Sequence, residues 1–320
     1  MKRLIVVVLG LIAGWTPASA QEYPTRPVRL LIGFAAGGSG DIVGRIVAQP
    51  ASEGLRQPLV IENRAGASGV IATEAAARAE PDGHTLLLGT MTTHALAPAL
   101  NARLPYDVGR DFAPVILLGR IPLLMSVNPG LPANSLKEFI ALAKASPGKY
   151  TFASAGDGSP AHLAGELLRR AAGIDLLHVP YKGTGPAVTD LMAGQVSMTI
   201  DGAPAQIAQV KAGRLRALAV ASDRRLAPLP GLPTFAEQGV PGMEISLWYG
   251  IYAPAATPAP VLGRLNAEFN RALALPEVRQ RFADLSVEPG GGGAAQFAAF
   301  NQTEILRWAQ VVRQSNIKLE

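Results

Sequence analysis

Short apolar runs alternate with amphipathic segments along almost the whole chain. The runs are rich in Val, Ile and Leu and have the length of strands; they lie at residues 28–34, 59–62, 85–89, 115–118, 123–127, 150–153, 176–179, 197–200, 215–220 and 245–252. Apolar strands separated by helices are typical of parallel sheets that helices cover on both faces. The pattern therefore predicts an α/β protein with mostly parallel sheets.

The segments between these runs carry the signals of helix starts. Ser135 and Glu138 form a Ser-x-x-Glu capping box, followed by apolar residues at helical spacing. Proline suits the first position of a helix, so further helices are predicted to open at Ser159-Pro160, Gly185-Pro186, Ala203-Pro204 and Thr257-Pro258. Two long scaffold helices are predicted at residues 261–275 and 294–314.

Two longer apolar passages, at residues 114–128 and 245–254, flank a block that has its own alternation of strands and helices. A chain of this length exceeds what one compact core usually holds. A chain that leaves one lobe along one strand and returns along another forms a two-stranded hinge. We therefore expect lobe 1 to comprise residues 21–122 and 251–320, and lobe 2 residues 123–250.

The N-terminus has the composition of a cleaved export signal. Lys2-Arg3 is followed by an apolar stretch at residues 4–12 and by Ala18-Ser19-Ala20, so the mature chain is predicted to begin near Gln21. The alternative is an uncleaved membrane anchor, but a bilayer span needs about 20 apolar residues. The sequence thus predicts residues 1–20 as a signal peptide and a location in the periplasm.

Cysteine usage and charge narrow the function classes. The chain has no cysteine, which excludes disulfides, thiol catalysis and thiolate metal sites. It has 29 Lys and Arg against 24 Asp and Glu, a formal net charge of +5, but its basic residues after the signal form no continuous stripe. Nucleic-acid binding usually needs such a stripe, so we expect none. Mild basicity instead favours the attraction of anionic ligands.

Glycine-rich loops follow several predicted strands and lead into helices. They lie at residues 35–41, 153–162 and 179–186, and more faintly at 201–204. A loop of this kind aims several backbone N–H groups at one point, which attracts an anion. In an exported protein this pattern predicts the capture of an anionic solute.

Four polar side chains in these loops each allow two interpretations. Asp41 either caps free N–H groups at its helix start or meets a donor group of the ligand. His162 either caps and packs or contacts the ligand. Tyr181 and Lys182 either add a phenol donor and a cation to the site or lie in solvent.

The patterns of known catalytic centres are incomplete. Gly38 and Gly40 with Glu62 partly match a dinucleotide-binding fingerprint, but Val43 stands where the third glycine belongs. No Gly-x-Ser-x-Gly elbow occurs, and the four histidines form no H-x-x-x-H pair. We therefore predict no catalytic residues, no cofactor and no metal site.

The chain closely resembles the Bug family, the extracytoplasmic solute receptors of tripartite tricarboxylate transporters in proteobacteria. The likeness covers essentially the whole mature chain. It includes Tyr23-Pro24-Thr25-Arg26-Pro27, Gly37-Gly38-Ser39 with Asp41, VIENRAGA at 60–67, Pro81-Asp82-Gly83, Leu104-Pro105-Tyr106-Asp107, ASAG at 153–156, HVPYKG at 178–183, LAV at 218–220 and Pro233-Thr234.

The resemblance implies a two-lobed periplasmic binding protein that closes on a small carboxylated solute and delivers it to a membrane permease, acting as a monomer. Matching positions imply a ligand-binding set made of Phe34, Ala36, Gly37, Gly38, Ser39 and Asp41 in lobe 1 and Ser154, Gly156, Gly158, Ser159, His162 and Tyr181 in lobe 2. Gly40 replaces the family's usual threonine, and His84 stands where tyrosine is common. The identity of the carboxylate stays open, as do a signalling receptor and an exported enzyme as alternatives.

Overall fold

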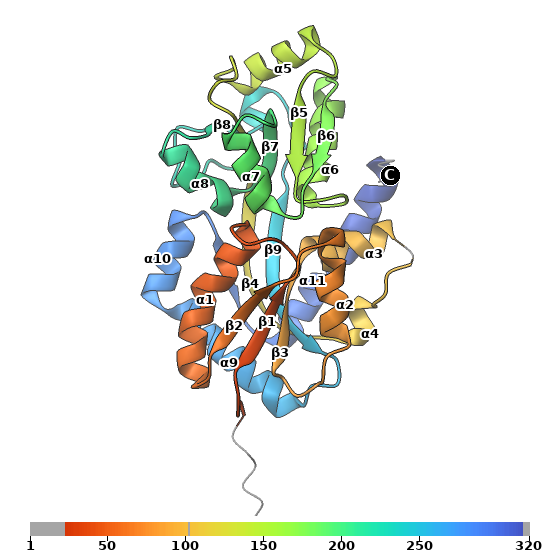
Figure 1. Ribbon diagram of the computed structural model, residues 1–320, viewed down its shortest axis with the longest axis vertical. Helices are drawn as coiled ribbons and strands as arrows, with labels where there is room; N and C mark the ends of the chain where they lie inside the picture. Colours follow the sequence, from red (N-terminus) through yellow and green to blue (C-terminus); the bar gives the residue numbers. More distant parts are fainter. Residues whose placement is uncertain (1–22, 102, 316–320) are drawn as a thin grey trace, which may run out of the picture.

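The molecule has two lobes joined by two neighbouring strands (Figure 1). This computed structural model describes residues 23–101 and 103–315, and the predicted signal peptide lies outside them. Both ends of the described chain belong to lobe 1, drawn in red, orange and blue, whereas lobe 2 comes from the middle of the chain and is drawn mostly in green. The predicted α/β fold with two lobes is confirmed.

The sheet of lobe 1 has the strand order β2-β1-β3-β9-β4, and β10 pairs with β4 as well. Its strands are β1 (Val28–Ile32), β2 (Leu59–Asn63), β3 (Thr85–Thr90), β4 (Phe112–Val127), β9 (Ser246–Pro254) and β10 (Glu288–Gly291). β1 pairs in parallel with β2 and β3, whereas β9 is antiparallel to β3 and β4. β1 and β3 are almost wholly buried, which explains their continuous apolar sequences.

The sheet of lobe 2 is built around the far end of β4. Its other strands are β5 (Thr151–Ser154), β6 (Leu177–Pro180), β7 (Met198–Gly202) and β8 (Arg216–Ala221). β5 lies between β6 and β7 and is parallel to both, while β7 and β8 are antiparallel to β4. The mostly parallel core of each lobe therefore carries antiparallel strands where the chain crosses between lobes.

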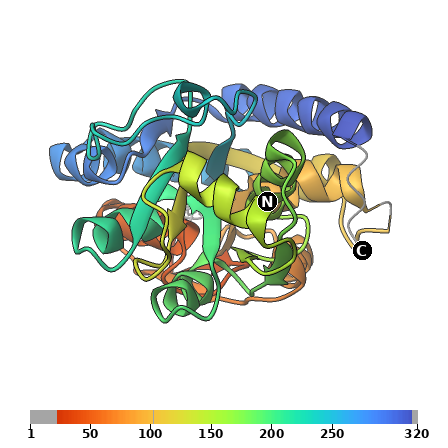
Figure 2. The ribbon, with the colours of Figure 1, turned by 90° about the horizontal axis from the view of Figure 1, so that it is seen from above.

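Helices cover both sheets. In lobe 1 they are α1 (Ser39–Leu55), η1 (Ala67–Gly69), α2 (Val70–Ala77), the π-helical η2 (Thr92–Leu96), α3 (Ala97–Leu100), α4 (Val108–Asp111), α9 (Ala259–Ala274), α10 (Pro276–Asp284) and α11 (Ala294–Ser315). In lobe 2 they are α5 (Leu136–Ala145), α6 (Pro160–Ala172), α7 (Thr184–Met192), α8 (Ala203–Lys211) and η3 (Ala236–Gln238). Seen from above, the blue helix α11 runs along one edge of the molecule (Figure 2). No helix of the described chain is long and apolar enough to cross a bilayer.

One long strand replaces two predicted strands. Residues 115–118 and 123–127 both belong to β4, because its first part pairs with β9 in lobe 1 and its last part, from Leu123, pairs with β7 and β8 in lobe 2. β4 and β9 together form the hinge. The pairing of β9 already begins at Ser246, whereas the predicted return to lobe 1 was after residue 250. The lobe boundaries themselves stay predictions.

Several element starts and ends differ from the predictions. β1 ends at Ile32, so Gly33 and Phe34 lie in the following loop. α6 opens at Ser159-Pro160 as predicted, but α7 and α8 each begin after a glycine cap, Gly183 and Gly202, before the predicted position. β10 has the sequence Glu-Pro-Gly-Gly, which has no apolar pattern, so only pairing with β4 makes it a strand.

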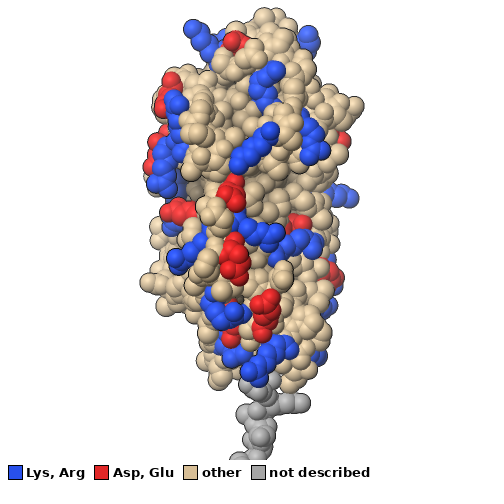
Figure 3. Space-filling view, turned by 90° about the vertical axis from the view of Figure 1, so that its left-hand side faces the viewer, with Lys and Arg blue, Asp and Glu red and all other residues tan. Residues whose placement is uncertain are grey.

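Charges of both signs are interspersed on the face shown in Figure 3. Acidic and basic side chains alternate there along the length of the molecule. Exposed ion pairs of the described chain include Arg26 with Asp82 and Arg225 with Glu237. This face therefore has no single-sign stripe of the kind that binds a polyanion.

Candidate functional site

The side chain of Asp41 holds the loop between β1 and α1. Its Oδ2 accepts a hydrogen bond from the N–H of Gly37 (3.0 Å), and its Oδ1 accepts one from Asn63 Nδ2 (3.1 Å). Arg45, one turn further along α1, pairs with it at 2.9 Å. Burial alone would raise the pKa of Asp41, but hydrogen bonds from Arg45, Gly37 and Asn63 outweigh it and hold this pKa below its usual value. Asp41 therefore holds the loop in front of α1 through Gly37, whereas the start of α1 itself has no side-chain cap. Its contact with a ligand stays a prediction.

Two serine hydroxyls hold the loop between β5 and α6. Ser154, at the end of β5, accepts a hydrogen bond from the N–H of Gly156 (3.1 Å). Ser159 caps α6 by accepting one from the N–H of His162 (3.2 Å). Gly156 has a φ of +128°, and a Cβ there would lie 2.7 Å from Ser68 Oγ of lobe 1. Glycine is thus needed at 156 for both the backbone conformation and the approach of the other lobe.

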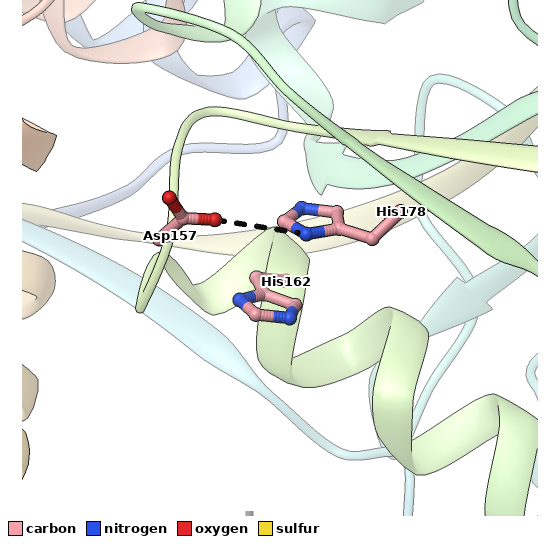
Figure 4. A group of neighbouring side chains, drawn as sticks. All are labelled: Asp157, His162 and His178. Atoms are coloured by element: carbon pink, nitrogen blue, oxygen red, sulfur yellow. Dashed lines mark ion pairs between the residues drawn. The ribbon is translucent and has the colours of Figure 1, made fainter. Parts of the chain in front are cut away.

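Two histidines and an aspartate meet beside this loop (Figure 4). The rings of His162 and His178 stack with centroids 3.9 Å apart and planes at 10°. His178 Nε2 lies 2.7 Å from Ser154 Oγ, and His178 Nδ1 lies 3.7 Å from Asp157 Oδ1. The spacing of the histidines in the sequence did not reveal this cluster, because its members come from three different elements.

The cluster has the spacing of a metal site but not its orientation. One ligand atom from each of Asp157, His162 and His178 lies within 4.8 Å of the others. An imidazole binds a metal through a lone pair in the plane of its ring. Two nearly parallel rings stacked 3.9 Å apart share no such point, so one ring would have to turn before both could bind one ion.

His178 lies between Ser154 and Asp157, as the histidine of a Ser-His-Asp hydrolytic triad lies between the other two residues. The Ser154 side chain, however, is fully buried, and its hydroxyl already hydrogen-bonds to the backbone of Gly156. The 3.7 Å between His178 Nδ1 and Asp157 Oδ1 exceeds a hydrogen bond. A nucleophile must reach its substrate. The three groups therefore stabilise the loop and do not form a hydrolytic centre.

Burial lowers the pKa of both stacked histidines. That of His178 falls to about 4, with the neighbouring His162 adding to the effect of burial. That of His162 is lowered mainly by burial. Both rings are therefore uncharged at neutral pH and stack without repulsion, while His162 Nδ1 accepts the N–H of Gly158 (3.3 Å). The packing role weighed for His162 is present, and its ligand contact stays a prediction.

Hydrogen bonds between the loops hold the two lobes in a closed form. They run from the N–H of Ala35 to the carbonyl of Lys182 (2.9 Å), from Ser39 Oγ to the carbonyl of Gly202 (3.1 Å) and from Ser68 Oγ to the carbonyl of Asp157 (2.6 Å). In each pair the donor belongs to lobe 1 and the acceptor to lobe 2. The contacts therefore exist only while the lobes are together.

Two chambers lie between the closed lobes. The inner chamber, beside β9 of the hinge, has a volume of about 30 Å³, and the outer chamber has about 190 Å³. Phe34 and Ala155 line both chambers. A volume of 30 Å³ holds only about two water molecules, so the lobes must part for any solute that enters the inner chamber.

The predicted ligand-binding residues fall into two groups. Phe34, Gly38, Ser39 and Asp41 line the inner chamber, and Phe34, Gly156 and Tyr181 line the outer one. The other predicted residues lie behind the chamber walls. Ala36 and Gly37 lie against Gly185 of lobe 2. Hydrogen bonds within the β5–α6 loop involve Ser154, Gly158, Ser159 and His162. The phenol of Tyr181 donates to Asp190 Oδ2 (2.7 Å), so it holds α7, while Lys182 lines the outer chamber.

Five polar residues of the inner chamber were not among the predicted ligand-binding residues: Thr90, Thr92, Thr184, Asp201 and Tyr249. The loops predicted at 179–186 and, more faintly, at 201–204 contain Thr184 and Asp201, but no ligand contact was assigned to either residue. Tyr249 lies on β9, and its orientation depends on how β9 pairs with β3 and β4. The hinge prediction therefore placed Tyr249 on a strand but did not indicate which way its side chain points.

Gly40 and His84, the two residues that differ from the pattern of the resembled family, lie in different surroundings. A Cβ on Gly40 would lie 3.1 Å from Tyr249 Cε1, so the tyrosine ring occupies the space beside Gly40 in the inner chamber. His84 instead packs edge-on against Tyr23, with ring centroids 5.2 Å apart, and lies outside both chambers. The change at Gly40 therefore alters the chamber wall, whereas that at His84 does not.

Comparison with known proteins identifies the family. The family model described as "Tripartite tricarboxylate transporter family receptor" matches residues 43–317. The chain belongs to this family. The receptor is 40% identical over 324 residues to protein BugT of Bordetella pertussis, which covers 100% of this chain and 99% of BugT. The resemblance seen in the sequence is confirmed, and the family is one of solute-binding receptors, not of enzymes.

Solved structures share both the fold and the sequence. A structure described as "R. palustris Rpa4515 with adipate" is 37% identical with a TM-score of 0.89, over 92% of this chain and 99% of that chain. MatC from Rhodopseudomonas palustris with bound malate is 36% identical with a TM-score of 0.86, over 91% of this chain and 100% of that chain. A structure described as that of a periplasmic transporter has 41% identity and a TM-score of 0.90, over 93% of this chain and 100% of that chain.

Proposed function

We propose that the receptor captures a small carboxylated solute between its lobes and presents the closed form to a membrane permease. The observation that carries the proposal is a pair of chambers between the lobes whose walls come from glycine-rich loops of both lobes. The adipate and malate bound to its structural relatives support a carboxylate as the solute.

The donors for a carboxylate come mainly from backbone. The first N–H groups of α1 have no partner within their helix, and a helix N-terminus favours negative charge. In α6 fewer N–H groups are free, because Pro160 has none and Ser159 caps that of His162. Lys182 adds a cation at the outer chamber. Each charge-assisted hydrogen bond contributes about 1.5–3 kcal/mol, which after the costs of association gives roughly micromolar affinity, about −8 kcal/mol.

Export and partner choice complete the proposal. The segment at residues 1–20 directs the chain to the periplasm, where the receptor acts as a monomer. Because the contacts between the lobes form only on closure, a permease that binds across both lobes distinguishes the loaded from the empty receptor. Transport follows from this selection without any chemical change of the solute.

A thermal-shift screen tests the proposal. Purified mature receptor is heated with a panel of organic acids, with the neutral amides of the same acids and with nicotinamide cofactors, and hits are measured by calorimetry. We expect one class of acid to raise the melting temperature, and its amide to have no effect. A receptor that ignores every acid, or that converts one into product, contradicts the proposal.

Deletion of the receptor in its host tests the coupling to transport. We expect cells that lack it to lose uptake of the labelled acid found in the screen, and a plasmid copy to restore the uptake. Normal uptake with a loss of induced gene expression would favour the signalling alternative instead.

A further inference from the structure

The inner chamber contains a buried carboxylate that has no cation beside it. Asp201 lies at the end of β7 and is 3% exposed. Its Oδ2 accepts a hydrogen bond from the hydroxyl of Thr184 (2.8 Å), and its Oδ1 accepts one from the N–H of Gly202 (2.7 Å). Among the described residues that line this chamber there is no lysine or arginine. The other carboxylate in its wall, Asp41, differs because Arg45 pairs with it at 2.9 Å.

An uncompensated carboxylate of this kind has a strong preference for donors. Burial raises the pKa of Asp201 to about 6, despite the hydrogen bonds from Gly202 and Thr184, so the group is mainly ionised above pH 7. An ionised carboxylate can accept about four hydrogen bonds, and these two donors leave room for more. A second carboxylate placed beside it would add like-charge repulsion in a site from which water is excluded.

The outer chamber differs in that a lysine lines it, although the carboxylate of Asp157 lines it as well. Lys182 lines it, and the loop of Gly156 borders it beside the first turn of α6. Phe34 and Ala155 form the wall that both chambers share. A solute that reaches from the outer chamber into the inner one therefore has Lys182 near one end and the acceptor Asp201 at the other.

We propose that Asp201 receives the distal end of the solute and that this end carries a hydrogen-bond donor, a hydroxyl or an ammonium group, instead of a second carboxylate. The inference rests on the proposed function, since it assigns the orientation and class of the captured acid. The receptor thereby selects monocarboxylates with a distal donor over diacids.

Calorimetry with matched acids tests the inference at pH 8. The four-carbon set is butyrate, 4-hydroxybutyrate, 4-aminobutyrate and succinate, which differ only at the distal end, and corresponding sets of three, five and six carbons cover the reach of the site. For the best chain length, we expect the hydroxy or amino acid to bind at least tenfold more tightly than the diacid. Trp248 lines the inner chamber, so its fluorescence provides a second readout of binding.

Two variants assign the selectivity to its residue. In Asp201→Asn we expect the advantage of the donor-bearing acid over the diacid to fall at least fivefold, because the charge is gone while the side-chain shape is kept. Asp175→Asn removes an exposed carboxylate from the same lobe, outside both chambers, and is expected to keep the wild-type ranking.

The outcomes separate the inference from the proposed function. A wild-type receptor that binds a diacid as tightly as the donor-bearing acid overturns the inference and leaves the proposed function standing. A folded Asp201→Asn variant with the wild-type ranking also overturns it. A wild-type receptor that binds no acid overturns both. If the variant does not fold, the wild-type ranking alone decides.

Discussion

At the scale of single residues, burial determines the chemical state of the groups around the cleft. His178 and Asp201 lie in the same lobe, one beside the β5–α6 loop and one in the inner chamber, and burial favours the neutral form of both. For a histidine this means a lowered pKa and for a carboxyl a raised one. The two groups therefore affect stability in opposite directions as the pH changes.

His178 makes the receptor sensitive to acid. Its folded-state pKa of about 4 lies below the 6.5 of an unfolded histidine, so the stability it contributes is complete above pH 6.5 and is lost as the pH falls through 4. In His178→Gln this loss is absent. We expect the melting temperature of the wild type, followed by circular dichroism from pH 7.5 to 4, to fall more steeply than that of the variant. Parallel curves would contradict the assignment.

Asp201 has the opposite effect. Its folded-state pKa of about 6 lies above the unfolded value of 3.8, so the stability it contributes is complete below pH 3.8 and is lost as the pH rises through 6. Asp201→Asn is therefore expected to gain stability relative to the wild type between pH 4 and pH 7.5, by up to about 3 kcal/mol. Urea unfolding at the two pH values measures this gain. A constant difference between the two proteins would show that Asp201 does not titrate in this range.

At the scale of elements, the start of α7 is built to meet the other lobe. A Cβ on Gly185 would lie 2.3 Å from the carbonyl oxygen of Ala36 in lobe 1. Within lobe 2, glycine at this helical position is weaker than alanine by about 0.5–1 kcal/mol. The glycine is therefore explained by closure of the lobes and not by the stability of its helix.

Gly185→Ala separates these two effects. We expect the variant to bind its solute at least tenfold more weakly, because the added methyl group prevents full closure, while the free receptor keeps or gains thermal stability. Gly263→Ala in α9 is the matched control, since a Cβ there meets nothing within 4 Å. Calorimetry with the acid found in the screen measures affinity. Unchanged affinity in Gly185→Ala would mean that the bound form is more open than the structure described here.

At the scale of the whole molecule, binding and closure form one equilibrium. The hydrogen bonds between the lobes are made only in the closed form, so each of them favours the state that holds the solute. The inner chamber has a volume of only about 30 Å³ in the closed form, which limits what it can enclose. A solute therefore sets how far the lobes come together.

Ser68→Ala tests this coupling. The variant loses the hydrogen bond from Ser68 Oγ to the carbonyl of Asp157 across the cleft. We expect an affinity about fivefold lower, from roughly 1 kcal/mol for one hydrogen bond, and a correspondingly faster release of the solute. Stopped-flow measurement of Trp248 fluorescence gives the release rate. Ser222→Ala, at a serine in neither chamber, is the control, and equal release from both variants would contradict a role of Ser68 in closure.

Much of the architecture was predictable because its signals are local. The apolar runs marked nearly all strands, and Ser159-Pro160 correctly marked the start of α6. β10 was missed since its sequence, Glu-Pro-Gly-Gly, is a strand only through pairing with β4. The sequence predicted two strands in place of β4. The two ends of β4 belong to different lobes, and the pattern of apolar residues does not show that one strand connects them.

The sequence by itself determined the class of protein, the glycine-rich loops and the family, because turns, caps and apolar periodicity act between residues close together in the chain. Tertiary structure alone decided which side chains share a chamber. Asp201 and Thr184 meet Ser39 only when two lobes built from distant segments close on each other, and Tyr249 joins them from β9 of the hinge. The stack of His162 on His178 likewise depends on the packing of α6 against β6. The selectivity of the site for its solute depends on these contacts, because the burial and the charge state of a side chain are set by its neighbours in space.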